Sequence, residues 1–115
     1  MYRALPLALL LTIGCEIQPE TFIEDFAANK CANIEACGKI SETHGTLDDC
    51  IEYYEIFADV NMVGEDCGLL QDQAKDCLSE LKDARDECPV TDAQSPSCAK
   101  VSDCSSSSAG SDTGR

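Results

Sequence analysis

The stretch LQDQAKDCLSELKDARDECP (residues 70–89) carries the clearest structural signal in the chain. Its apolar side chains recur at steps of three and four residues, the spacing of one face of an α-helix. These positions are Leu70, Ala74, Cys77, Leu78, Leu81 and Ala84 or Arg85. Charged residues fill the other positions, as on a solvated face. Since Pro89 cannot continue a helix, the pattern predicts a helix that ends just after Cys88.

Residues 19–37 show the same period, and Gly38 is a natural stop for a helix there. The expected apolar stripe comprises Phe22, Ile23, Phe26, Ala27, Cys31 and Ile34. Thr21 and Glu24 have the spacing of a capping box at its start.

A polar loop over residues 39–45 leads to a second predicted helix, with Thr46 as its N-cap and two aspartates in its first turn. The expected inner face comprises Leu47, Cys50, Ile51, Tyr54 and Phe57 or Ala58. This helix is expected to fray over residues 61–64. With no alternating strand pattern, the fold class is all-α: a small three-helix, disulfide-stapled bundle, with or without one short helical turn between Ser97 and Cys104.

The chain contains nine cysteines, which are Cys15, Cys31, Cys37, Cys50, Cys67, Cys77, Cys88, Cys98 and Cys104. Zinc and thioredoxin-like redox sites favour C-x-x-C, but the closest pairs here have five residues between them. His44 is the only histidine. If Cys15 is set apart, the other eight form an even set, which predicts four structural disulfides.

Up-down-up packing narrows the 105 pairings that eight cysteines allow. Cys37 ends the first helix and Cys50 opens the second, so Cys37–Cys50 is the best predicted pair. Cys31 and Cys77 lie at similar heights on helices that run the same way, so Cys31–Cys77 is the second. Cys67 and Cys88 flank the third helix about 30 Å apart and cannot bond each other. Cys67 and Cys88 are each expected to form a disulfide with one of Cys98 and Cys104. Both ways of pairing them stay open.

The first fifteen residues explain why Cys15 is set apart. A basic start and an apolar run from Ala4 to Ile13 precede Gly14-Cys15, as in an export signal. The run is far shorter than the roughly 20 residues that span a bilayer. Leu11–Cys15 resembles the lipobox of bacterial lipoproteins, in which the chain is cut before a cysteine that carries diacylglycerol. It departs from that pattern at Thr12, where leucine is usual. The alternative is an ordinary signal peptide cut after Gly14, which would leave Cys15 free.

These observations define four segments. Residues 1–14 are the predicted signal peptide, and 15–18 the lipidated N-terminus with a short tether. Residues 19–104 are the disulfide-rich helical domain, and 105–115 a Ser/Gly-rich tail expected to be disordered. The chain also carries 22 acidic against 8 basic side chains, a net charge of -14. Nucleic acid is therefore not an expected partner, because phosphate binding needs a basic footprint.

As a whole, the chain resembles the small cysteine-rich lipoproteins that some gram-negative bacteria encode in numbers. The likeness rests on Leu11–Cys15, on the segment from Phe26 to Gly38, on Cys50, on Cys77-Leu78 and Leu81, and on Cys88-Pro89. It implies an envelope location and a stapled helical architecture, but no residue roles. The eight-cysteine pattern of plant lipid-transfer proteins does not fit, since adjacent Cys-Cys and Cys-x-Cys are both missing.

No catalytic pattern such as G-x-S-x-G, a P-loop or H-E-x-x-H occurs in the sequence. His44 lies in a polar loop and is expected to be solvated. Two carboxylate clusters, Asp48/Asp49/Glu52 and Glu65/Asp66, lack the alternation of an EF-hand loop. Of Tyr53 and Tyr54, adjacent on one helix, one must face outward and is available for a contact surface. No catalytic, cofactor-binding or metal-binding residue is therefore expected, and no cofactor.

The expected function is that of a lipid-anchored envelope protein, with acyl chains such as palmitate on Cys15, attached to the outer membrane rather than the inner. It is expected to act as a non-catalytic structural or protein-interaction module, not as an enzyme. Two alternatives stay open. The first is a binding module for a small ligand or a divalent cation, and the second is a secreted disulfide-rich inhibitor or effector if Cys15 is not lipidated.

Overall fold

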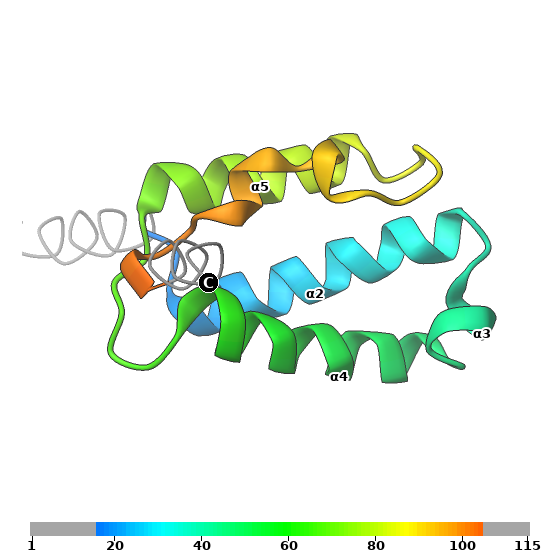
Figure 1. The fold of residues 1–115 in the computed structure, drawn as a ribbon, viewed down its shortest axis with the longest axis horizontal. Coiled ribbons are helices and arrows are strands. Elements are labelled where there is room, and N and C mark those ends of the chain that lie inside the picture. The colour runs from blue at the N-terminus through cyan, green and yellow to red at the C-terminus, as the bar shows by residue number, and fades with distance from the viewer. Residues whose placement is uncertain (1–15, 105–115) are drawn as a thin grey trace, which may run out of the picture.

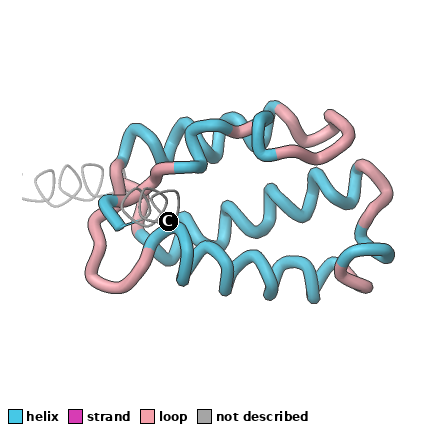
Figure 2. Tube along the Cα trace, viewed as in Figure 1, coloured by secondary structure: helices cyan, strands magenta, loops and turns pink. Residues whose placement is uncertain are grey.

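The computed structural model describes residues 16–104, and the predictions for residues 1–14, Cys15 and 105–115 lie outside that range. Three main helices, α2 (Pro19–Ala36), α4 (Leu47–Phe57) and α5 (Gln71–Asp83), run up, down and up, with α2 in contact with both others (Figure 1). Between residues 16 and 104 there is no strand (Figure 2), and the one bridge joins Leu69 to Ser102. The all-α, disulfide-stapled fold class is confirmed.

Helix α2 begins at Pro19, which confirms the predicted start of this helix but not the capping box. Its N-cap is Gln18, which makes no side-chain capping bond, so the predicted role of Thr21 and Glu24 is wrong. Proline fixes φ near the helical value and lacks the amide hydrogen that would otherwise be unpaired, so it starts the helix itself. At the other end the predicted stop at Gly38 is confirmed. Gly38 has φ +72°, and its amide donates to the Glu35 carbonyl in a Schellman turn.

The connection to α4 is not only a loop, because residues Ile40–Thr43 form the short helix α3. The predicted N-cap of α4 is confirmed, since the Thr46 hydroxyl accepts a hydrogen bond of 3.1 Å from the Asp49 amide. The predicted fraying after α4 is wrong. Residues Ala58–Val63 continue as the π-helical segment η1, which buries Met62 and Val63 in the core. Burial of these two side chains outweighs the poorer geometry of the wider turn.

Helix α5 ends at Asp83, five residues before the predicted end. The buried side chain of Asn33 on α2 contacts the chain directly after this end. Its Nδ2 atom donates to the carbonyl oxygens that follow α5, those of Ala84 (3.1 Å), Arg85 (2.7 Å) and Glu87 (3.1 Å). Carbonyls in the turn that leaves α5 are thus bonded to another helix, as the last carbonyls of a helix need partners outside it, and the chain turns away before Pro89.

The segment after Pro89 packs back along α5 through two 3₁₀ turns, η2 (Asp92–Gln94) and η3 (Pro96–Ala99). The short helical turn allowed after Ser97 is present as η3, which begins at Pro96. Val101 is fully buried, and its carbonyl accepts from the Leu70 amide at 2.8 Å. The Ser102 hydroxyl donates to the Met62 carbonyl at 2.6 Å. This return segment therefore completes the core that three helices alone would leave open. The main core consists of Phe22, Phe26, Ala58, Met62, Val63, Ala74, Cys77, Leu78, Leu81 and Val101.

All eight cysteines from Cys31 to Cys104 are disulfide-bonded, but not as expected. The pairs are Cys31–Cys50, Cys37–Cys88, Cys67–Cys104 and Cys77–Cys98. The predicted pairs Cys37–Cys50 and Cys31–Cys77 are both wrong. The prediction that Cys67 takes Cys98 or Cys104 is right, whereas the same prediction for Cys88 is wrong.

The connection between α2 and α4 accounts for the first error. The Schellman turn and α3 fold the chain back, so Cys50 faces Cys31, with 6.0 Å between their Cα atoms. Cys31 lies six residues, or about 9 Å, before Cys37 along the helix axis. Cys37 is left facing the chain that turns out of α5, where it meets Cys88. Cys77 points instead toward the return segment and meets Cys98.

Candidate binding pocket and contact surface

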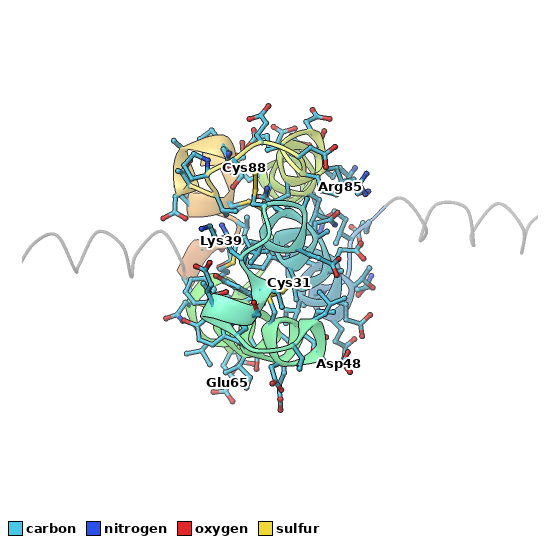
Figure 3. All side chains as sticks on the ribbon, turned by 90° about the vertical axis from the view of Figure 1, so that its right-hand side faces the viewer. Cys31, Lys39, Asp48, Glu65, Arg85 and Cys88 are labelled. Carbon is cyan, nitrogen blue, oxygen red and sulfur yellow. A yellow bond between two sulfur atoms is a disulfide. The ribbon has the colours of Figure 1, made fainter. Side chains whose placement is uncertain are left out.

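An open pocket of about 760 Å³ lies among α2, α3, α4 and the chain from Cys88 to Asp92. One wall is aromatic, and most of the lining surface is apolar. The aromatic wall consists of Phe26, His44, Tyr53, Tyr54 and Phe57. Figure 3 views the bundle from the end at which the pocket lies, with Cys88 above Lys39. The Cys37–Cys88 disulfide and the Schellman turn hold the two sides of this end together.

The turn after α3 brings His44 against two tyrosines of α4. Its ring centroid lies 5.1 Å from that of Tyr53 and 5.5 Å from that of Tyr54, and Tyr53 and Tyr54 meet edge to face at 4.8 Å. His44 is half-buried rather than solvated, which corrects the prediction for this residue. The aromatic wall continues inward through a Phe26–Tyr54 contact at 6.2 Å. Such ring pairs hold one another in fixed orientations.

Burial raises the pKa of the Tyr54 phenol above its usual value of 10.0, and the neighbouring Tyr53 and Asp92 raise it further. Tyr54 therefore remains a neutral hydrogen-bonding group at the edge of the pocket throughout the physiological pH range.

Two lysines line the pocket, and they differ in exposure. The Lys30 side chain is only 11% exposed, and its ammonium lies 3.9 Å from the carboxylate of the fully exposed Asp92. Lys39 is half exposed and pairs with Glu42 at 3.6 Å. The aliphatic stem of Lys30 packs within α2's inner face while its charge reaches the pocket, as long cationic side chains commonly do. The pocket thus combines an apolar wall with a buried cation.

The outer face of α4 is a second feature, which we call the α4 face. It is defined by Tyr53, Ile56 and Phe57 of α4, which share one side of that helix, and by Val60 of the following segment η1. Ile56 and Val60 are 59% and 66% exposed, and every exposed large apolar side chain recorded between residues 16 and 104 lies between Leu47 and Val60. Leu47 itself was expected on the inner face and is exposed instead. The sequence-based expectation that one of Tyr53 and Tyr54 faces outward is met by Tyr53, which is 53% exposed.

The carboxylate clusters considered for calcium are not assembled into a site. Asp48 and Asp49 lie exposed in the first turn of α4, and Glu65 and Asp66 lie in an exposed turn after Gly64. Among the described residues, no group of three or more His, Cys, Asp and Glu is placed to hold a metal ion. Cys15, the predicted lipidation site, lies outside the described residues. Within residues 16–104, no helix has both the length and the apolar character needed to cross a membrane.

Two buried polar residues of α2, Lys30 and Asn33, were missed by sequence reasoning. The signal was present, since positions 26, 30, 33 and 37 follow the helical spacing of the inner face. A search restricted to apolar residues passes over them. Lys30 reaches the pocket, and Asn33 fixes the turn that carries the opposite wall.

Comparisons with models of protein families, with curated proteins and with solved structures find no match to this chain. The residues themselves therefore carry the functional argument. The pocket brings together apolar rings, a buried cation and disulfide-bonded sulfurs. This arrangement is suited to binding another molecule.

Proposed function

We propose that this protein is a lipid-anchored envelope protein that works as a non-catalytic protein-interaction module, with the α4 face as its contact surface. The lipobox-like sequence Leu11–Cys15 supports the anchor. The four disulfides of the described domain are typical of exported proteins, because thiols stay reduced in the cytosol.

The single observation that carries the interaction role is the concentration of exposed apolar side chains on one helix. Scattered exposed apolar residues are normal, whereas a contiguous patch marks an interaction site. Here Tyr53 and Ile56 of α4 and Val60 of η1 are all more than half exposed and recur at steps of three and four residues. Tyrosine supplies large contact area with little loss of conformational entropy, and aromatic residues are enriched in interface cores.

The charge around the α4 face points to the chemistry of the partner. Glu52, Glu55 and Asp59 flank this face, and residues 47–63 contain no Lys or Arg. An apolar centre with an acidic rim complements a protein surface whose apolar centre is rimmed by lysine and arginine. A second copy of this chain would place like charges opposite each other across a two-fold interface, which disfavours self-association.

A photo-crosslinking amino acid tests this surface in the native host. It is placed at Ile56 or Val60, and in a matched control at Lys82, which is exposed on α5. The proposal expects one discrete heterologous adduct from the α4 positions and none from Lys82. Reversal of the rim charge in a Glu52→Lys, Asp59→Lys background should abolish that adduct. Equal crosslinking from α4 and α5, a dimer-sized product alone, or no adduct would each overturn the contact-surface proposal.

Intact mass of the protein from its native host tests the anchor separately. A chain beginning at Cys15, carrying a diacylglycerol and gaining eight hydrogen atoms on reduction, two for each of the four disulfides, is expected. An unmodified chain would contradict the anchor and favour a secreted inhibitor or effector.

A further inference from the structure

We infer that the pocket beside α4 is a binding site for an amphipathic organic anion, a carboxylate or sulfonate carried on an acyl chain or an aromatic ring. Lys30 is the residue that recognises the charge. This inference concerns a small ligand and goes beyond the proposed contact surface, with which the pocket shares Tyr53 and Phe57, and its test needs no protein partner.

The shape and lining of the pocket indicate a small molecule with an apolar body. Its volume of about 760 Å³ falls within the roughly 300–1,000 Å³ of typical small-molecule sites. Phe26, Tyr54 and Phe57 offer ring surfaces, and Ile34 and Val90 add aliphatic surface. Contact with these groups would remove the ligand's apolar body from water, which is the main source of affinity in such sites.

The charges of the pocket are opposite in sign to those of the rest of the protein. The whole chain has 22 acidic and 8 basic side chains, yet the pocket is lined by two lysines and one acidic residue, Asp92. A cationic ligand would meet Lys30 and Lys39 at close range. An anion would be attracted by the two lysines. Elsewhere on the described surface it would be repelled, because most charged groups there are carboxylates.

Lys30 dominates this recognition because of its burial. Its present partner, Asp92, is fully exposed at 3.9 Å, so water screens the ion pair strongly. Lys39 is half exposed and already paired with Glu42 outside the pocket lining. A ligand carboxylate that entered beside Lys30 would form a charge-assisted hydrogen bond in a setting less accessible to water, where such bonds are stronger.

The test compares two probes with the same chain length and opposite charge. Dodecanoate and dodecyltrimethylammonium are titrated calorimetrically, below their micelle concentrations, into oxidised Cys15→Ser protein, in which no attached acyl chain competes. Dodecanoate is expected to bind at one site, about tenfold more tightly than the cation, which corresponds to about 1.4 kcal/mol. No binding by either probe, or equal binding of both, would overturn the inference.

Substitutions then locate the charge. Lys30→Met keeps the unbranched stem and removes the ammonium, and it should lower dodecanoate affinity roughly tenfold. It should leave the binding of the cation no weaker, because the repulsion from Lys30 is removed. Lys75→Met, on the exposed face of α5, is the matched control and should change neither. Equal effects of Lys30→Met and Lys75→Met would contradict the assignment. If Lys30→Met fails to fold, Lys39→Gln provides a second test, because Lys39 is half exposed. A smaller loss of dodecanoate affinity is expected. If the affinity does not change, a charge site formed by the two lysines is overturned.

Discussion

The Nδ2 atom of Asn33 lies 2.7 Å from the carbonyl oxygen of Arg85, 52 residues away in sequence. Asn33 sits on the inner face of α2 and is 2% exposed, so it makes this bond inside the protein. Together with its bonds to the carbonyls of Ala84 and Glu87, it holds the turn after α5 against α2, where the following chain meets Cys37. One amide group thus couples two helices and one wall of the pocket.

Replacing Asn33 with alanine should lower the free energy of unfolding by about 1–3 kcal/mol, because buried and partly buried carbonyl groups lose a donor. Chemical denaturation with all disulfides intact measures this loss. The control is Asn29→Ala, since Asn29 is only partly buried and its side chain bonds to the Asp25 carbonyl on its own helix. Equal effects of the two substitutions would show that the hydrogen bonds from Asn33 to the turn after α5 do not contribute more to stability than the bond within α2.

Disulfide mapping by mass spectrometry should find a peptide that joins Cys37 to Cys88. Removing this bond with alanine at both positions should cost about 4 kcal/mol, because it closes a loop over a separation of 51 residues. Removing Cys31–Cys50, with a separation of 19, should cost less, about 3 kcal/mol. A mapped Cys37–Cys50 peptide would contradict the structure and restore the pairing expected from sequence.

Gly64 and Gly38 form a matched pair for backbone strain. Both have positive φ, but Gly64 has φ 77° and ψ 169°, a region open essentially only to glycine. An added Cβ at Gly64 would lie 3.1 Å from the sulfur of Cys67, whereas nothing lies within 4 Å of one at Gly38. Gly38→Ala should therefore cost about 1–2 kcal/mol. Gly64→Ala should cost clearly more, and thermal unfolding of the two variants should rank them in that order.

Raising the pH above 10 should destabilise the protein through Tyr54. Since the pKa of Tyr54 is raised in the folded state, the unfolded chain loses its phenolic proton first. The stabilising contribution is therefore complete below the unfolded pKa of about 10 and is lost as pH rises through the folded pKa. Tyrosinate absorbance of a Tyr53→Phe chain beginning at Cys15 reports Tyr54 alone. Its midpoint should be higher in the folded protein than in denaturant, and identical midpoints would refute the shift.

The helices were predictable from sequence because their apolar residues follow the helical period over many turns. The inner face of α5 was identified correctly at Ala74, Cys77, Leu78 and Leu81. The ends were less predictable, since α5 ends before Pro89 and the turn that follows it is hydrogen-bonded to Asn33, which is distant in sequence. A local sequence pattern cannot predict a hydrogen bond between residues that are 52 positions apart.

The disulfide pairing failed for a related reason. The prediction compared the positions of the cysteines along ideal helices and assumed that a plain loop joins α2 to α4. The short helix α3 lies in that connection and shifts α4 relative to α2, so Cys31 and not Cys37 is the partner of Cys50. Val101 was also overlooked, because one buried valine in a polar segment has no period to reveal it. In the pocket, the tyrosines were noticed as a pair, whereas the approach of His44 and of residues 88–92 depends on tertiary structure.

The two ends of the described chain leave the bundle at the same pole. The main chain of Ile17, which lies within the predicted tether, exchanges hydrogen bonds with the Gln71 side chain, and Ser102 pairs with Leu69 just before it (Figure 1). The pocket lies toward the opposite pole, beside α3 and residues 88–92. A protein tethered to a membrane through residue 15 would therefore hold its pocket outward, toward arriving molecules. A reporter fused after residue 104 would begin on the membrane side, where it leaves that entrance unobstructed.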